Sequence, residues 1–281
     1  MTEPSMEQHP SPRPLVEICC GDLRSALEAG KGGADRVELC DRLEVGGTTP
    51  GAGTIAEACR ALAIPVHVLV RVRAGDFAPD RAELAAMRDD VDVARRLGAS
   101  GVVLGLLRRD GTVDRDATAS LIDLARPMSV TFHKAFDQTP DLDEALETLI
   151  DLGVDRVLTS GGRASAEEGA EALARLVARA GDRIGVLVAG RLTLANLVPA
   201  RRRVDARLVR RPGREGPRGH GSRVGARPVL TAAGPGRLSA PRPGFAAPPC
   251  RGTGRRRPSA PRGVRPRRRP RLAGRGSGRR S

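Results

Sequence analysis

The sequence predicts an α/β protein built as a TIM-type (β/α) barrel. Short runs rich in β-branched residues alternate with amphipathic stretches rich in Ala, Leu, Glu and Arg, and this unit occurs seven times. Such alternation is typical of parallel strands joined by helical crossovers. No G-x-G-x-x-G turn follows the first strand, which argues against an open dinucleotide-binding sheet. A closed ring of strands inside a jacket of helices fits these features best.

The units follow one another in order. The expected strands are Val16–Cys20, Arg36–Cys40, Val66–Arg71, Val102–Leu107, Ser129–His133, Arg156–Ser160 and Gly185–Ala189. The expected helices are Leu23–Gly30, Thr54–Ala63, Arg81–Leu97, Asp114–Ala125, Leu142–Leu152 and Ala166–Ala180, with a further helix beginning at Thr193.

Helix-ending signals support these boundaries. Asp22, Asp80 and Asp141 stand where a side chain can cap the first turn of a helix. Gly98 and Gly153 directly follow predicted helices, as helix-stopping glycines do.

The pattern ends near residue 198. The chain has 281 residues and a formal net charge of +15. Residues 191–281 contain 26 Arg, 13 Pro and 14 Gly but only two acidic residues. This composition cannot bury a core, so we expect a disordered, low-complexity basic tail over 199–281. Residues 1–14 are polar and proline-rich and are also expected to be disordered. The barrel over 15–198 is then incomplete, with strand eight missing and the edges of its first and seventh strands open.

Two interpretations of the tail stay open. Dense arginine neutralises phosphates, so the tail could bind nucleic acid. Alternatively, a shifted reading frame in GC-rich DNA yields Arg, Pro, Gly and Ala in such proportions. The abruptness of the change favours the shifted frame.

Composition excludes several classes of protein. No apolar run approaches the roughly 18 residues that a membrane span needs, and the N-terminus lacks the basic start and apolar core of a signal peptide. We therefore expect a cytoplasmic protein whose five unevenly spaced cysteines are free thiols. Trp and Tyr are absent, which removes the usual stacking platforms for single-stranded nucleic acid.

Ionisable residues recur at every second position of the apolar strands. They therefore share one face of each strand, the face that points toward the barrel lumen. Burial of unpaired charges is costly, so each is expected to be paired or functional. The residues at this parity are Glu17, Cys19, Arg36, Glu38, Cys40, His67, Arg71 and His133.

Cys19 and Cys40 end neighbouring strands. Adjacent strands lie about 4.8 Å apart, so the two thiols can reach one ion, and soft thiolates favour Cu(I). The hypothesis is a copper site of Cys19 and Cys40, with Cys20 or His67 as further candidates. The alternative is that these are small buried core residues, which the spacing alone favours.

A second set of residues suggests an anionic ligand and acid–base chemistry. His67, His133, Asp76 and Asp137 are candidates for proton transfer, and Glu17, Arg36, Glu38, Arg71 and Arg73 for ligand binding. The loop at Ser160 and Gly161 could cradle an anion with its backbone N–H groups. The alternative is a satisfied salt-bridge network. In the loop after the second strand, Thr49 and Pro50 are expected to cap and begin a helix.

Six motifs in order resemble the CutC family of copper homeostasis proteins. They are Glu-Ile-Cys-Cys (17–20), Gly-Ala-Asp-Arg-Val-Glu-Leu-Cys (33–40), Gly-Gly-Thr-Thr-Pro (46–50), Arg-Val-Arg-Ala-Gly-Asp-Phe (71–77), Thr-Phe-His-Lys-Ala-Phe-Asp (131–137) and Arg-Val-Leu-Thr-Ser-Gly-Gly (156–162). The resemblance implies a TIM-type barrel, a cytoplasmic copper-binding protein, a homodimer, and copper ligands at Cys19 and Cys40. An enzyme acting on a small anionic metabolite is the alternative function.

The sequence departs from the family pattern after the seventh strand. Arg191 stands where another Gly is usual, and the family's eighth strand with its His and Ser is not found. Any ligand site between strands seven and eight is therefore in doubt.

Overall fold

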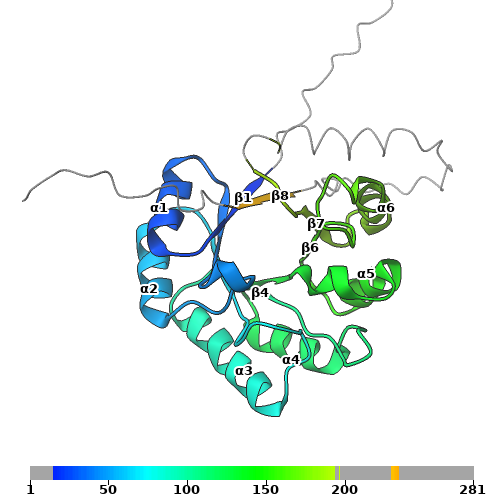
Figure 1. The fold of residues 1–281 in the computed structure, drawn as a ribbon. Coiled ribbons are helices and arrows are strands. Elements are labelled where there is room, and N and C mark those ends of the chain that lie inside the picture. Colours follow the sequence, from blue (N-terminus) through cyan, green and yellow to red (C-terminus); the bar gives the residue numbers. More distant parts are fainter. Residues whose placement is uncertain (1–14, 194–195, 197–228, 234–281) are drawn as a thin grey trace, which may run out of the picture. The chain divides into compact units, whose positions relative to one another are not determined.

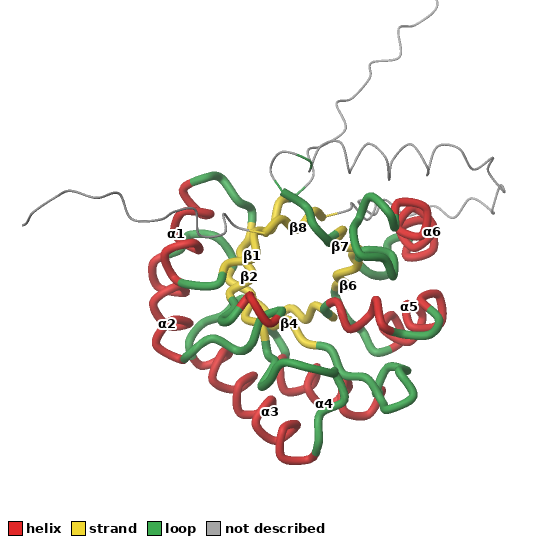
Figure 2. Tube along the Cα trace, viewed as in Figure 1, coloured by secondary structure: helices red, strands yellow, loops and turns green. Residues whose placement is uncertain are grey.

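A ring of eight parallel strands forms the centre of the molecule, and helices surround it (Figures 1 and 2). In this computed structural model, residues 15–193, Asn196 and the strand at 229–233 are described. The predicted disordered segment 1–14 lies outside the described residues, as does the predicted tail 199–281 apart from that strand. Most of the helix expected from Thr193 also falls outside them.

The strands pair in chain order around the ring, and β8 closes it against β1. The strands are β1 (Val16–Cys20), β2 (Arg36–Leu39), β3 (Val66–Leu69), β4 (Gly101–Leu104), β5 (Ser129–Phe132), β6 (Arg156–Thr159), β7 (Gly185–Val188) and β8 (Val229–Ala233). The helices are α1 (Leu23–Lys31), α2 (Ala52–Ala61), α3 (Arg81–Arg96), α4 (Arg115–Ala125), α5 (Leu142–Asp151) and α6 (Ala170–Ala180), with short 3-10 helices at Leu43–Val45 and Lys134–Gln138.

The predicted α/β barrel is confirmed, and seven of its strands lie where the sequence pattern placed them. Asp22, Asp80 and Asp141 each accept a hydrogen bond from a backbone N–H in the first turn of the helix that follows. The expected cap at Thr49 differs, because α2 begins after Gly51. The Thr49 hydroxyl instead accepts a hydrogen bond of 2.9 Å from the backbone N–H of Arg71 and joins two loops at the barrel mouth.

The eighth strand corrects the expectation that strand eight is missing. Val229–Ala233 pairs with β1, where Ile18 faces Ala232, and with β7, where Val188 faces Leu230. The segment is apolar, contains two residues that favour strands and stands between Pro228 and Gly234. The unpaired backbone groups on the edges of β1 and β7 are satisfied by this pairing, so the apolar segment adds to the sheet although its surroundings are rich in Arg, Pro and Gly.

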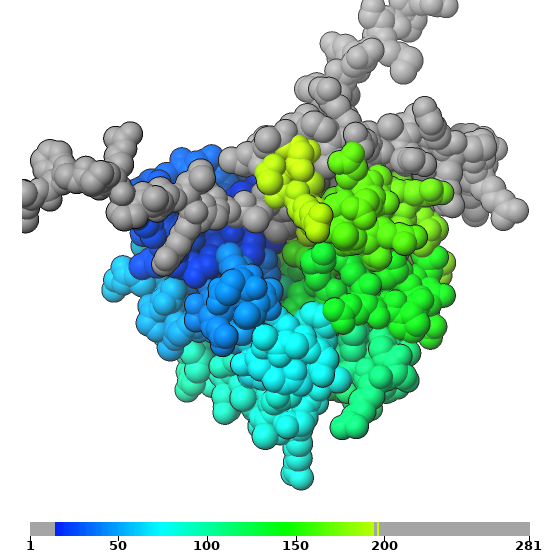
Figure 3. Space-filling model, in the orientation of Figure 1, coloured from blue at the N-terminus to red at the C-terminus, as the bar shows by residue number. Residues whose placement is uncertain are grey.

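Two separate apolar regions lie on the two faces of the ring. The large core lies between the strands and the helices and includes Val37, Val68, Val102 and Phe132. Small clusters on the opposite face lie inside the ring, such as Cys40, Leu69 and Val103. In the space-filling view, atoms of the described residues cover much of the opening that the tube leaves at the centre of the ring (Figure 3). The small clusters occupy part of the lumen.

Removal of β8 should destabilise the barrel. A chain ending at Pro228 loses β8 and exposes two sheet edges, whereas a chain ending at Leu238 keeps it. We expect the shorter chain to aggregate and to melt about 5 °C or more below the longer one, measured by circular dichroism and size-exclusion chromatography. Equal melting temperatures for the two truncations would contradict a stabilising role for this strand.

Candidate functional site

Two thiols meet inside the ring near the ends of β1 and β2. The Sγ atoms of Cys19 and Cys40 lie 3.6 Å apart. For Cys19, the hydrogen bond with Cys40 favours the thiolate, but burial and the nearby Glu38 outweigh it and raise its pKa. For Cys40, the hydrogen bond with Cys19 and then burial hold the pKa well above its ordinary value. Both residues are therefore protonated thiols at neutral pH when no ion is bound.

Glu38 adds a carboxyl group to the thiol pair. One oxygen of Glu38 and the two sulfurs all lie within 4.8 Å of one another. Burial, followed by the negative charge of Glu17, raises the pKa of Glu38 to about 8. The two sulfurs are soft donors and the carboxyl oxygen is a hard one. Together they suit a soft cation that replaces the protons of these groups when it binds.

The strand register favours an ion over a disulfide at this pair. Cys19 lies opposite Glu38, and Cys40 is two residues further along its strand. With a rise of about 3.3 Å per residue and strands about 4.8 Å apart, the two Cα atoms are about 8 Å apart. Disulfides need Cα atoms within roughly 4.4–6.8 Å, so the backbone would have to move before the sulfurs could bond.

The other predicted copper ligands do not join this set. Cys20 has the opposite parity, is fully buried in the core between strands and helices, and donates to the Ile18 carbonyl at 3.5 Å. Burial raises its pKa to about 12. Cys59, which was not a predicted ligand, also lies outside this set, half-buried on α2, and burial raises its pKa. His67 lies in the lumen but is not part of the Cys19, Glu38 and Cys40 group.

A charged layer lies at the level of the strand beginnings. Glu17 and Arg36 face each other across β1 and β2 and form a buried ion pair. On the opposite side of the ring, Arg156 donates to the Ser129 hydroxyl. His67 is buried near them, and desolvation, followed by the charges of Arg36 and Arg156, lowers its pKa to about 2. The salt-bridge interpretation therefore accounts for the Glu17 and Arg36 pair, whereas Nη2 of Arg36 and Nδ1 of His67 are buried without a hydrogen-bond partner among the described residues.

Two glycines of the β4 region make room for the buried histidines. A Cβ at Gly101 would lie 2.7 Å from the His67 ring, and a Cβ at Gly105 would lie 2.3 Å from the ring of His133. Sequence reasoning missed this role, although both glycines have the parity of the lumen-facing residues. A glycine at a lumen-facing position, next to a strand that carries a lumen-facing histidine, is the sequence signal that could have shown this role.

Arg71 and His133 both lie close to the Phe77 ring at the mouth. The Arg71 guanidinium lies 4.9 Å from the centre of the Phe77 ring, and the His133 ring centre is also 4.9 Å from it. The Nδ1 atom of His133 accepts a hydrogen bond of 3.1 Å from the N–H of Ala135. Burial, followed by the charge of Arg71, lowers the pKa of His133 to about 3. His133 is therefore neutral at pH 7, with its proton on Nε2.

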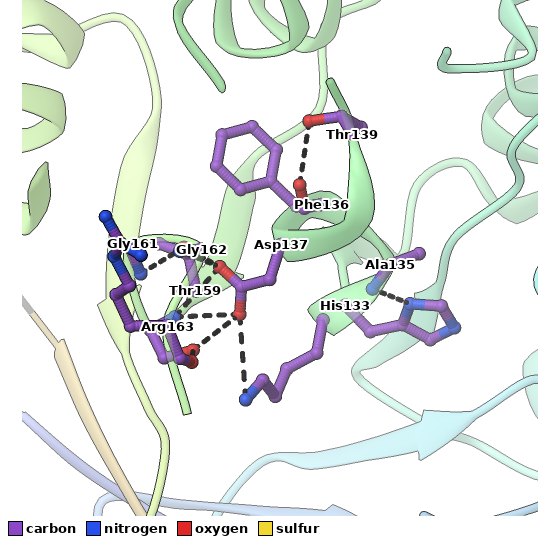
Figure 4. A network of polar contacts seen from close by, with 11 residues as sticks. His133, Ala135, Phe136, Asp137, Thr139, Thr159, Gly161, Gly162 and Arg163 are labelled. Atoms are coloured by element: carbon purple, nitrogen blue, oxygen red, sulfur yellow. Dashed lines mark hydrogen bonds and ion pairs between the residues drawn. The ribbon is translucent and has the colours of Figure 1, made fainter. Parts of the chain in front are cut away.

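Asp137 occupies the glycine loop that was expected to hold an anion (Figure 4). Its carboxylate accepts hydrogen bonds from the backbone N–H groups of Ser160, at 2.9 Å, and Gly162, at 2.9 Å. It also accepts from the Ser160 hydroxyl at 2.8 Å and from the Thr159 hydroxyl. The N–H of Gly161 donates to the Thr159 hydroxyl instead. The loop's donors thus have internal partners, and ligand binding at Ser160 and Gly161 stays a prediction that requires Asp137 to be displaced.

Arg73 and Asp76 lie apart from the thiols. Arg73 pairs with Glu83 and with Asp76, whose carboxylate is 2.8 Å away, in a partly exposed cluster before α3. Its hydrogen bonds with Arg73, and then the N–H of Ala78, lower the pKa of Asp76. Neither residue lines the main cavity at the barrel mouth. Catalytic roles for Asp76, His67, His133 and Asp137 stay predictions.

The main cavity has a volume of about 320 Å³ and joins the thiols to the Arg71 and His133 side of the mouth. Cys19, Glu38 and Cys40 line one wall, and Arg71 and His133 belong to the lining as well. Most of the residues near the strand ends that the sequence pattern placed on the lumen side therefore line this one cavity. It is the candidate functional site.

A family model described as the CutC family matches residues 14–204. The chain belongs to the CutC family. A CutC family protein from Mesorhizobium japonicum is 50% identical over 190 residues, which cover 68% of this chain and 74% of that protein. The human copper homeostasis protein cutC homolog is 45% identical over 183 residues, covering 65% of this chain and 67% of its own length.

Solved structures agree with this assignment. The putative copper homeostasis protein CutC from Streptococcus agalactiae has a TM-score of 0.68 and 28% identity, covering 79% of this chain and 99% of that one. A putative lyase/mutase from Burkholderia cenocepacia has a TM-score of 0.50 at 16% identity, covers 80% of this chain and 78% of that one, and shows a shared fold alone. None of the helices in the described part of this chain is long and apolar enough to span a membrane.

Gly101→Ala should destabilise the protein because the new methyl group meets the buried His67 ring. We expect a loss of about 1–3 kcal/mol in the free energy of unfolding, measured with urea. In a His67→Ala background the loss should largely disappear. Gly53→Ala is the matched control, because a Cβ at that position in α2 meets nothing within 4 Å. A loss of the same size in both backgrounds would refute the contact.

Glu38 should make the unfolding free energy depend on pH. Its pKa is raised from 4.5 to about 8 by folding, so its contribution is complete below pH 4.5 and is lost as the pH rises toward 8. The loss is up to about 1.4 kcal/mol per pH unit. Glu38→Gln should remove this part of the slope between pH 5 and 8 in metal-free protein, whereas Glu44→Gln, at an exposed site, should not. If the unfolding free energy of Glu38→Gln depended on pH as strongly as that of the wild type, the buried carboxyl group would not be the source of the dependence.

Proposed function

We propose that this protein takes part in cytoplasmic copper homeostasis by binding Cu(I) through Cys19 and Cys40. The observation that carries the proposal is the 3.6 Å separation of two sulfurs inside the barrel mouth. Membership of the CutC family supports it, since the human and mouse relatives are named copper homeostasis proteins. In this role copper is the ion that the protein handles rather than a catalytic cofactor.

The chemistry of the donors agrees with Cu(I). Thiolates are soft ligands, and soft ligands favour Cu(I) over the hard cations that carboxylates prefer. Leu69 and Val103 pack beside the two cysteines, so part of the surroundings of the sulfurs is apolar, which disfavours hydrated divalent ions. Because the strand register holds the Cα atoms too far apart for an unstrained disulfide, the thiols stay available for the ion.

Glu38 completes the proposed site as a third donor or as a hydrogen-bond partner. Its position within 4.8 Å of both sulfurs allows either role. The homodimer and the nucleic-acid contact through the basic tail remain predictions, and the tail lies outside the described residues apart from β8.

Copper titration of single-cysteine variants tests the proposal. Under anaerobic conditions, with a chromophoric Cu(I) chelator as competitor, the wild-type protein should bind one ion per chain. Cys19→Ser and Cys40→Ser should each weaken binding by about 100-fold or more, because each removes one of two soft ligands.

Cys59→Ser and Cys250→Ser are the controls. Cys59 lies on α2 away from the cavity, and Cys250 belongs to the tail. Both should bind copper as the wild type does. Wild-type affinity and stoichiometry in both Cys19→Ser and Cys40→Ser would eliminate the thiol site.

A further inference from the structure

The cavity at the barrel mouth carries an excess of positive charge. Among the described residues, its lining includes the cations Arg71, Lys134 and Arg191 but a single carboxyl group, that of Glu38. The ammonium group of Lys134 lies 3.6 Å from the Asp137 carboxylate, which offsets part of its charge. The cavity therefore has a net positive charge even when Glu38 is ionised, and a positively charged cavity attracts anions.

Arg71 is a buried cation of this cavity whose hydrogen bonds go to neutral groups. Its side chain is 9% exposed, and its terminal nitrogens donate to the carbonyls of Val45, Gly47 and Gly75 at 3.2, 2.9 and 2.9 Å. Its Nε atom is buried with no partner, and no carboxylate in the described part of the chain forms an ion pair with Arg71. The carbonyls and the Phe77 ring that contact this guanidinium are neutral and leave its charge uncompensated, so an anion beside it would be strongly stabilised.

His133 presents a second buried donor in the same wall. Its ring is 7% exposed and lines the cavity, and its Nε2 atom is buried with no partner. Because Nδ1 accepts from the N–H of Ala135, Nε2 carries the proton and donates. An unsatisfied buried donor destabilises the protein, and a ligand oxygen that accepted from it would remove that cost.

Arg191 places a third donor at the rim. Its backbone has φ 53°, in the left-handed region that a residue with a Cβ seldom adopts. The backbone there is held by Asn196, whose side-chain amide donates to the Arg191 carbonyl at 3.0 Å. The backbone of Arg191 thus has a defined partner, and the residue belongs to the lining of the cavity.

We propose that this cavity binds a small organic carboxylate, whose charged end lies at Arg71, His133 and Arg191 and whose apolar end packs on Leu69, Leu158 and Leu192. The apolar residues belong to the lining of the same cavity. Its volume of about 320 Å³ is near the lower end of the range of small-molecule sites, so the ligand is small. The inference does not rest on copper binding, although the two sites share a cavity.

Calorimetric titration of the copper-free protein tests the proposal with three probes. Isovalerate has a carboxylate on an apolar body, isovaleramide has the same shape without charge, and inorganic phosphate has charge without an apolar body. We expect saturable binding of isovalerate at one site and at least about tenfold weaker binding of the other two. Equal binding of the amide, or tighter binding of phosphate, would overturn the assignment.

Arg191→Gly is the informative variant, because replacement of Arg71 would also release three loop carbonyls and could unfold the mouth. Glycine adopts a positive φ without strain, so the turn is preserved. We expect isovalerate affinity to fall about tenfold in Arg191→Gly. Arg42→Gly is the matched control, since Arg42 also has a left-handed backbone, with φ 49°, but does not line the cavity.

Unchanged affinity in Arg191→Gly, or an equal loss in Arg42→Gly, would refute the site. Cu(I) titration of Arg191→Gly separates this proposal from the copper site. That variant should bind Cu(I) as the wild type does while its isovalerate affinity falls, because Arg191 is not among the ion donors Cys19, Glu38 and Cys40.

Discussion

The alternation of side chains along closed parallel strands is the constraint on which this molecule depends. Successive residues of a strand face opposite sides, so each strand contributes one set to the helix layer and another to the lumen. In β2, Val37 and Leu39 belong to the outer core, while Arg36 and Glu38 face inward. The outer set supplies the stability of the fold, and the inner set supplies its chemistry.

The inner set is itself divided along the barrel axis. Near the strand beginnings, the Glu17 and Arg36 pair satisfies its own charges inside the ring. Near the strand ends, the thiols face each other, and among the described residues Arg71 has no acidic partner and Nε2 of His133 has no hydrogen-bond partner. Buried polar atoms without a partner occur in both layers, since Nη2 of Arg36 and Nδ1 of His67 also lack one, but only Arg71 and His133 of these four residues line the open cavity.

Much of this arrangement could be predicted from the sequence because it follows from periodicity. The positions of seven strands, three aspartate caps and the meeting of Cys19 with Cys40 depend on local pattern and on strand parity. β8 could not be found in the same way, because a short apolar segment within an Arg-rich stretch is stabilised by the edges of β1 and β7 rather than by its own sequence. The roles of Gly101 and Gly105 also depend on contacts with neighbouring strands, which parity alone does not reveal.

The glycine loop after β6 has a further consequence. Successive backbone N–H groups in a turn can hold an anionic ligand. Here the Asp137 carboxylate takes the hydrogen bonds of the Ser160 and Gly162 N–H groups from within the same chain. An anion could bind at this loop only by displacing that tethered carboxylate, so Asp137 is a built-in competitor for any ligand there.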